Sequence, residues 1–227
     1  MWSDSSAPII SGFSSQFSTF SSSSKVARSR RRAHANEMRM TGPSEDGPAL
    51  VGIFHSPYID CAPSGGALPS PSLSPMPRHK IKVVALSSGG GHWVQLLRLR
   101  PAFEDTNLIF ATVHEGYRAD VPGCEFRVIH DGNRSQKIAL LKSAVSILFL
   151  LLVEKPDVVI STGAAPGYFA VRFGRLLRMK TIWVDSIANA EELSMSGQKA
   201  GRCADLWLTQ WPDLAQEGGP QYLGSVI

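Results

Sequence analysis

A run of three glycines followed by a histidine contains the residue types best suited to hold an anion. Ser88-Gly89-Gly90-Gly91-His92 follows residues 81–87, a β-branched and apolar stretch typical of a buried parallel strand. Glycines carry no side chain, so backbone N–H groups can approach a phosphate, and a helix that begins behind them adds partial positive charge. We therefore predict a phosphate-group binding site here. The structural alternative is a tight turn that only needs positive φ.

His92 begins the expected helix at the mouth of this turn. Its imidazole could hydrogen-bond a phosphate or take a proton from a hydroxyl near neutral pH, and a purely structural histidine is the alternative. Two common nucleotide motifs fit poorly. A dinucleotide fingerprint that starts at Gly89 needs a small residue where Val94 stands, even though Glu115 could mimic its ribose-binding acid, and no Gly-Lys-Ser/Thr of a P-loop follows.

Two later strand ends carry further candidate groups. Ser161-Thr162-Gly163-Ala164-Ala165-Pro166-Gly167 is a second glycine-containing turn, so two helix starts could converge on one anionic group, although an ordinary turn is the alternative. Asp185 and Ser186 follow the apolar stretch 181–184. They could hold sugar hydroxyls, Asp185 could act as a base, and a helix N-cap is the competing role. The predicted binding residues here are Thr162, Gly163, Ala164, Gly167 and Ser186.

These turns need a parallel sheet to bring them together. Hydrophobic periodicity and turn residues predict alternating strands and helices. The expected strands are 81–87, 107–113, 126–130, 158–160, 181–184, 205–210 and 221–227, and the expected helices are 92–103, 136–153 and 168–177. Alternation of this kind indicates an α/β, doubly wound, mainly parallel sheet, in which ligands bind beyond the carboxyl ends of the strands.

The expected helix 136–153 is apolar around most of its circumference, which is more than one core-facing stripe requires. It is too short, and too interrupted by Lys142, to cross a bilayer comfortably, but it could lie at a membrane interface; a fully buried core helix is the alternative. Arginines recur every third residue in the next helix and could face anionic lipids or be simply solvated. The predicted membrane-contact residues are Ile147, Phe149, Leu150, Arg172 and Arg175.

Composition divides the chain near Lys80. Residues 1–79 are crowded with Ser, Pro and Gly and show almost no apolar periodicity, so we expect a disordered tail and one folded domain, 80–227. The arginines at 28 and 30–32 superficially resemble those of a transit peptide. Because Met76 stands just before the first strand, we hypothesise that the natural protein begins there.

The remaining composition excludes several classes of protein. The net charge of +4 divides evenly, with seven basic against five acidic residues before Lys80 and sixteen against fourteen from it onward, so neither part suggests nucleic-acid binding. The cysteines at 61, 124 and 203 are widely spaced and form no metal or disulfide pattern, which fits a reducing cytoplasm. We expect neither a metal nor a cofactor.

The order of these motifs resembles a known family. Leu86 to His92, Pro156 to Ala164, Asp185-Ser186, Leu193 to Gly197 and Ala204-Asp205 look like the acceptor-side subunit of split UDP-sugar glycosyltransferases. Such subunits serve eukaryotic N-glycan precursor assembly and, as PssD-like proteins, bacterial exopolysaccharide synthesis. The sequence is more distantly similar to the N-terminal half of the peptidoglycan glycosyltransferase MurG. Asp185 departs from the pattern, in which Glu is common, and the Ser/Pro-rich N-terminus resembles the bacterial type more than the membrane-anchored eukaryotic one.

The resemblance implies the N-terminal, acceptor-binding half of a GT-B glycosyltransferase, which needs a small donor-binding subunit as its partner in a heterodimer. The acceptor would be a polyprenyl-diphosphate-linked saccharide at the cytoplasmic face of the membrane, with its diphosphate on the turn from Gly89 to His92. We then expect His92 or Asp185 to deprotonate the attacking hydroxyl. A non-catalytic scaffold that recruits the transferase to the membrane is the rival function, and a nucleotide-cofactor oxidoreductase is a weaker one.

Overall fold

The computed structural model describes residues 80–132 and 136–226, so the expected tail, 1–79, and the hypothetical start at Met76 lie outside the described part of the chain. The strands are β1 (Lys82–Leu86), β2 (Asn107–Thr112), β3 (Glu125–Val128), β4 (Val158–Ser161), β5 (Lys180–Val184), β6 (Leu206–Thr209) and β7 (Gln221–Tyr222). The α-helices are α2 (Gly91–Arg98), α3 (Lys137–Glu154), α4 (Ala164–Leu176) and α5 (Met195–Gly201), and the 3-10 helices are η2 (Arg100–Phe103), η3 (Glu115–Asp120) and η4 (Pro212–Leu214).

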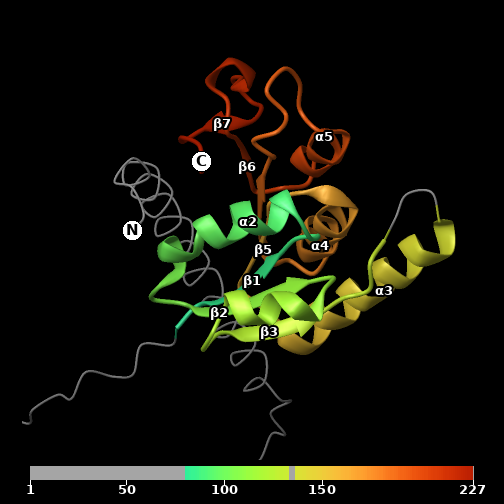
Figure 1. Ribbon diagram of the computed structural model, residues 1–227. Coiled ribbons are helices and arrows are strands. Elements are labelled where there is room, and N and C mark those ends of the chain that lie inside the picture. The colour runs from blue at the N-terminus through green and yellow to red at the C-terminus, as the bar shows by residue number, and fades with distance from the viewer. Residues whose placement is uncertain (1–79, 133–135, 227) are drawn as a thin grey trace, which may run out of the picture. The chain divides into compact units, whose positions relative to one another are not determined.

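The strands form one seven-stranded sheet in the order β3-β2-β1-β4-β5-β6-β7, and every neighbouring pair is parallel (Figure 1). The chain builds outward from β1 to β3 and then returns to place β4 on the other side of β1. This reversal is the topological switch point of a doubly wound, Rossmann-like sheet, where ligands usually bind. The predicted fold class is confirmed, and the glycine turns that follow β1 and β4 flank the switch point.

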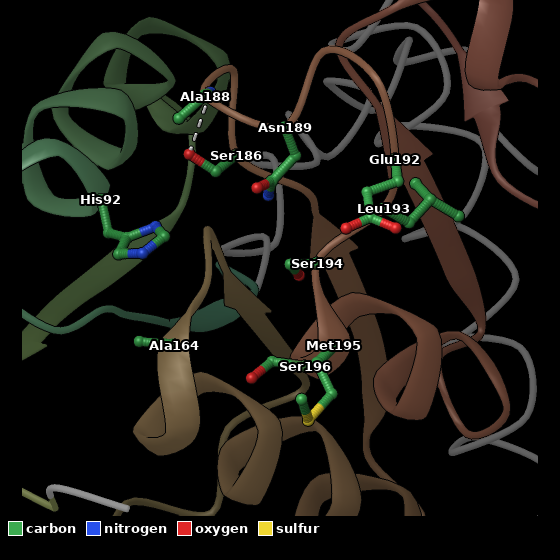
Figure 2. Close-up of a pocket in the computed structure, with 10 residues that line it drawn as sticks. All are labelled: His92, Ala164, Ser186, Ala188, Asn189, Glu192, Leu193, Ser194, Met195 and Ser196. Carbon is green, nitrogen blue, oxygen red and sulfur yellow. Dashed lines mark hydrogen bonds between the residues drawn. The ribbon is translucent and has the colours of Figure 1, made fainter.

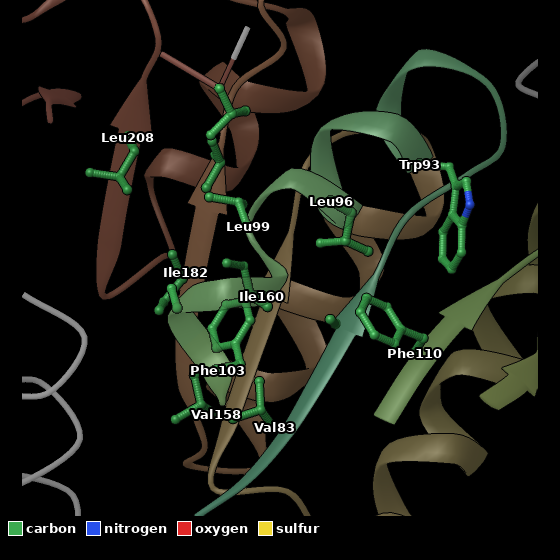
Figure 3. Packing of buried hydrophobic residues seen from close by; sticks show 14 of the residues in the cluster. Val83, Trp93, Leu96, Leu99, Phe103, Phe110, Val158, Ile160, Ile182 and Leu208 are labelled. Carbon is green, nitrogen blue, oxygen red and sulfur yellow. The ribbon is translucent and has the colours of Figure 1, made fainter. Parts of the chain in front are cut away.

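Helices cover both faces of the sheet. In β1, Val83 and Ala85 pack with α2 and η2 in a core that also includes Trp93 (Figure 3). Val84 and Leu86 point the other way and pack with α3 and α4. This alternation follows from the two-residue period of a strand, and burial on both faces explains why the strands are apolar throughout.

Helix α3 is fixed at its C-terminal end. Lys155 takes a left-handed conformation, with φ of 46°, and Pro156 follows, so the helix ends where the sequence predicted. Glu154, at the last turn, accepts hydrogen bonds from Lys82 at 2.7 Å and from Arg127 at 2.9 Å. The bond from Lys82 is the main cause of a lowered pKa for Glu154, and Arg127 adds to it.

The structure corrects several expected boundaries. The helix expected over 92–103 ends at Arg98, because Pro101 has no N–H to continue it, and a 3-10 turn completes the segment. The last strand is only Gln221–Tyr222. Helix α5 was not predicted, since a seven-residue segment with two glycines has little helical propensity.

Candidate functional site

The glycine turn after β1 is open on one side and covered on the other. Gly90 has φ of +67°, a conformation that favours glycine, and nothing lies within 4 Å of a Cβ built on Gly90 or on Gly91. On the covered side, Tyr117 of η3 lies over the turn. Its hydroxyl oxygen accepts a hydrogen bond from the Gly90 amide at 3.0 Å and would be 3.1 Å from a Cβ on Gly89. One amide of the glycine run is therefore already bonded.

His92 joins this turn to the one after β4. Its Nδ1 lies 2.9 Å from the backbone oxygen of Thr162, and the Thr162 hydroxyl donates to the backbone oxygen of His92 at 2.7 Å. A carbonyl oxygen only accepts, so Nδ1 must carry the proton, and Nε2 of the neutral ring keeps its lone pair. The imidazole packs directly on Gly163, where a Cβ would come within 2.4 Å of the ring.

The second glycine turn is shorter than expected. Helix α4 already begins at Ala164, so only Thr162 and Gly163 connect it to β4. Gly167 belongs to the helix and packs against Ser161, whose Oγ would lie 2.0 Å from a Cβ. The close approach of the helix to the strand accounts for a glycine at this position without a ligand. Ala164 has φ of +62° and faces the pocket described below.

The buried carboxylate of Asp185 accepts hydrogen bonds from the loop that follows β5. The side chain is 2% exposed. One carboxylate oxygen, Oδ1, accepts from the Ser194 hydroxyl at 2.7 Å, the Ser186 amide at 3.1 Å and Asn189 Nδ2 at 3.4 Å. The other, Oδ2, accepts from the Ser194 amide at 2.9 Å. Both oxygens are thus occupied by the chain itself, and Asp185 does not line the pocket. The geometry favours a role in positioning the loop over the predicted role as the base.

An N-cap role was the alternative for Asp185 and Ser186, but the N-cap of α5 is Ser194. Its hydroxyl accepts a hydrogen bond from the Gly197 amide at 2.8 Å while it donates to Asp185. A Cβ on Gly197 would come within 2.8 Å of the Asp185 carboxylate, so glycine is required there for this close approach. Asp185 therefore fixes the start of α5 relative to β5.

Ser186 is part of a buried hydrogen-bond network. Its hydroxyl accepts from Gln95 Nε2 at 3.1 Å and from the Ala188 amide at 3.3 Å. Gln95 Oε1 accepts in turn from Gln210 Nε2 at 2.8 Å, and Gln210 Oε1 accepts from the Val226 amide at 2.9 Å. This network connects α2, the loop after β5 and the C-terminal segment. It gives one wall of the pocket a defined shape.

The loops enclose a pocket of about 400 Å³ (Figure 2). His92 and Ala164 lie on one side of it, at the starts of α2 and α4, and the segment from Ser186 to Ser196 forms the other side. The lining residues are His92, Ala164, Ser186, Ala188, Asn189, Glu192, Leu193, Ser194, Met195 and Ser196. Three of the predicted site residues, His92, Ala164 and Ser186, line the pocket, whereas Asp185 and Gly167 do not.

Sequence reasoning missed the pocket residues Asn189, Glu192 and Met195, and it missed Tyr117 over the glycine turn. Asn189 and Glu192 lie in an irregular loop, where periodicity carries no signal. Their position after Asp185-Ser186, at the carboxyl end of a strand, was the available clue. Tyr117 lies in a 3-10 helix that the sequence did not predict.

The predicted membrane-contact residues do not share one surface. Ile147 and Leu150 are buried against the sheet, at 0% and 8% exposure, so the prediction for these two residues is wrong; α3 packs them into the core because it must cover the sheet. Phe149 is 68% exposed. Together with Ile138, Leu141, Val145, Leu152 and Val153 it forms an exposed apolar face of α3, at the spacing of one helical side.

Arg172 and Arg175 lie on the side of α4 near α5. Arg175 pairs with Asp205, and both arginines act on the thiol of Cys203, whose pKa is raised by burial and lowered in smaller part by their charge. They therefore do not flank the apolar face of α3. Among the described residues, no helix is both long and apolar enough to cross a membrane.

Residues 119–226 match the family model described as "Oligosaccharide biosynthesis protein Alg14 like". The "UDP-N-acetylglucosamine transferase subunit ALG14" of Eremothecium gossypii is 26% identical over 181 residues, which cover 62% of this chain and 75% of that protein. The subunit of the same name from Schizosaccharomyces pombe is 32% identical over 92 residues, covering 38% of this chain and 44% of that protein. These matches confirm the resemblance drawn from the sequence motifs through its eukaryotic members, and they do not bear out the expected closer likeness to the bacterial type.

Among solved structures, MurG of Acinetobacter baumannii aligns with a TM-score of 0.53 at 15% identity, over 64% of this chain and 46% of that chain. UDP-N-acetylglucosamine 2-epimerase from Rickettsia bellii aligns with a TM-score of 0.51 at 12% identity, over 65% of this chain and 46% of that chain. At such identities the likeness is one of fold, which agrees with half of a GT-B architecture. The chain spans less than half the length of each of these two structures.

Proposed function

We propose that this chain is the acceptor-binding subunit of a two-component, inverting glycosyltransferase. The reaction transfers a sugar from a UDP-sugar to a polyprenyl-diphosphate-linked saccharide, in the biosynthesis of lipid-linked oligosaccharide or exopolysaccharide. The similarity to ALG14 proteins, whose names describe a transferase subunit, supports this role. The likeness to part of MurG is consistent with one half of a GT-B fold.

The observation that carries the proposal is the reciprocal pair of hydrogen bonds between His92 and Thr162. The pair joins the two helix starts at the switch point of the sheet. It also holds the imidazole at the pocket with Nδ1 as the donor to Thr162, which leaves Nε2 as the ring nitrogen that can take a proton from a hydroxyl.

The proposed reaction uses His92 as the base. The acceptor hydroxyl oxygen attacks the anomeric carbon of the UDP-sugar and forms the new C–O bond. The bond from that carbon to the phosphate oxygen breaks, and its electron pair leaves with UDP. The hydroxyl proton passes to Nε2 of His92, and the Nδ1–H bond to Thr162 stabilises the resulting cation.

The acceptor diphosphate would lie at the open side of the glycine turn. The first amides of a helix have no intrahelical partner, so those of Gly91 and His92 can donate to an anion there, and the start of α4 lies on the same side. The Gly90 amide already donates to Tyr117, which makes the tyrosine hydroxyl a further polar group at the edge of this site.

The donor site would be supplied by a second, smaller subunit. Contact with the membrane would be made by the exposed apolar face of α3, which includes Phe149, at the cytoplasmic side of the membrane. Within this face Lys142 is also exposed, so an anionic headgroup could pair with it. The buried residues Ile147 and Leu150 take no part.

The test is sugar transfer by the chain co-expressed with its donor-binding partner. His92→Asn keeps a donor for the Thr162 oxygen but removes Nε2, so the loops should stay joined while turnover falls by about 100-fold or more. His130→Ala, at an exposed histidine after β3, is the matched control and should retain wild-type turnover.

The scaffold hypothesis makes the opposite prediction. If His92→Asn forms an intact complex and keeps wild-type turnover, His92 is not the base; if Asp185→Asn keeps it as well, the chain recruits its partner without taking part in the chemistry. The comparison therefore separates a catalytic subunit from a non-catalytic one.

A further inference from the structure

The pocket beside His92 differs in charge from the glycine turn next to it. Among the ten described residues that line it there is no lysine and no arginine, and the one carboxylate is that of Glu192. Within the described part of the chain, this carboxylate forms no hydrogen bond or ion pair. It is exposed and lies on the wall opposite Ala164 (Figure 2). A phosphate group placed in the pocket would therefore meet an uncompensated like charge.

The same wall suits a neutral molecule with many hydroxyl groups. The Glu192 carboxylate can accept hydrogen bonds from hydroxyls, and the Asn189 side chain keeps its amide oxygen as an acceptor while its nitrogen donates to Asp185. Met195, which is 59% exposed, adds apolar surface against which the C–H face of a sugar ring could pack. The volume of about 400 Å³ falls within the range of roughly 300–1,000 Å³ that is usual for small-molecule sites.

The wall is also held in place before any ligand arrives. Asp185 bonds both the amide and the hydroxyl of Ser194, and it anchors Asn189. Ser186 is fixed by a hydrogen bond from Gln95 of α2. Binding to a pre-organised wall costs less conformational entropy, because its side chains are already ordered, and this favours selective recognition of a small ring.

We infer that this pocket binds a neutral pyranose of the acceptor, with Glu192 and Asn189 bonded to its hydroxyl groups, and that it excludes the diphosphate, which binds outside it at the starts of α2 and α4. The inference rests on the proposed function, because it divides the acceptor into two subsites. Glu192 is a specificity-determining residue in this arrangement, and Asp185 is a positioning residue.

The experiment titrates the full chain with two separate probes, N-acetylglucosamine and inorganic pyrophosphate, and follows backbone amide signals by NMR. The sugar should shift amides of residues 189–196, and pyrophosphate should shift those of residues 88–92. Glu192→Gln should weaken sugar binding at least fivefold and leave pyrophosphate binding unchanged. Glu191→Gln is the matched control, since Glu191 is an exposed neighbour that does not line the pocket, and it should change neither.

Pyrophosphate displacing the sugar from residues 189–196 would overturn the inference. So would unchanged sugar binding by Glu192→Gln in a protein whose melting temperature equals that of the wild type. Sugar transfer by the complex with the partner is measured separately. If the wild-type complex transfers no sugar but the pocket still binds sugar in a way that depends on Glu192, the proposed function alone is wrong. If the wild-type complex transfers sugar normally but no sugar binds in this pocket, the inference alone is wrong.

Discussion

The carboxylate of Asp185 bonds both the amide and the hydroxyl of Ser194, at 2.9 and 2.7 Å, nine residues further along the chain. The two residues close the loop that forms one wall of the pocket. The acid at the end of β5 therefore acts on the shape of the site, and its loss should be seen first in stability and in substrate affinity.

Asp185→Asn replaces one of these acceptor oxygens with an N–H donor. We expect the free energy of unfolding to fall by about 1–3 kcal/mol, because a buried hydrogen-bonding group of Ser194 loses its partner. Urea denaturation measures this change. The KM for the acceptor should rise by a larger factor than turnover falls, because the loop is displaced while His92 is unaffected.

Asp213→Asn serves as the control, since Asp213 is exposed on η4, and it should change neither quantity. If Asp185→Asn instead slowed turnover by about 100-fold or more while stability and KM were retained, Asp185 would be the base.

Gly91→Ala tests the open side of the glycine turn. Gly91 has neither a positive φ nor any atom within 4 Å of its Cβ position, so alanine should fit, and stability should stay the same or rise by about 0.5–1 kcal/mol at this first helical residue. The added methyl group projects into the space where the diphosphate would approach. We expect the KM for the lipid-linked acceptor to rise about tenfold or more, measured by sugar transfer with the partner subunit.

Gly90→Ala is the comparison. The φ of +67° at Gly90 disfavours alanine, so this substitution should lower stability as well. Unchanged KM and stability in Gly91→Ala would mean that the anion does not bind against this turn.

The sequence predicted the sheet because strands buried on both faces are unambiguous apolar runs, as in Val158-Val159-Ile160. It predicted the position of His92, at the start of the first helix, because the residue after a glycine run at the end of the first strand has few possible positions. It could not assign Asp185, since its partner Ser194 follows in an irregular loop whose path depends on the tertiary structure. The buried position of Gly167 likewise depends on how closely α4 approaches β4.

The orientation of α3 was harder to predict. Apolar residues surround the helix, so periodicity alone cannot say which side packs on the sheet. Only the structure separates Ile147 and Leu150, which cover the sheet, from Phe149, which points outward. The alternative of a fully buried core helix is wrong, because one side of α3 is exposed, and membrane contact by that side stays a prediction.

Acid should weaken the attachment of α3 to the sheet. The pKa of Glu154 is lowered from its ordinary value of 4.5 by Lys82 and Arg127, so the carboxylate contributes stability above that value and loses it as the pH falls through the lowered folded-state value. At pH 7, Glu154→Gln should reduce the free energy of unfolding by about 1–2 kcal/mol. The difference from wild type should shrink as the pH approaches 3, measured by urea denaturation.

Glu125→Gln is the matched control, because Glu125 also pairs with Arg127 but has a side chain that is 46% exposed. It should cost no more than about 0.5 kcal/mol at pH 7. A Glu154→Gln deficit that stays constant between pH 7 and pH 3 would contradict the linkage.

Phe149→Glu tests the exposed face of α3 as a membrane-contact surface. The side chain is 68% exposed, so the folded protein should keep its melting temperature, but a carboxylate would have to be desolvated on entering the lipid interface. We expect flotation with vesicles of phosphatidylcholine and phosphatidylserine to fall by at least fivefold. Leu141→Glu, on the same face, should have the same effect.

Val94→Glu is the control for the added charge. Val94 is 48% exposed on α2, which covers the opposite face of the sheet, so its substitution should leave flotation unchanged. If Val94→Glu and Phe149→Glu lower flotation equally, the loss reflects net charge and not a defined surface. If neither lowers it, the outer face of α3 does not contact lipid, and a protein partner is the better explanation for six exposed apolar side chains on one helix.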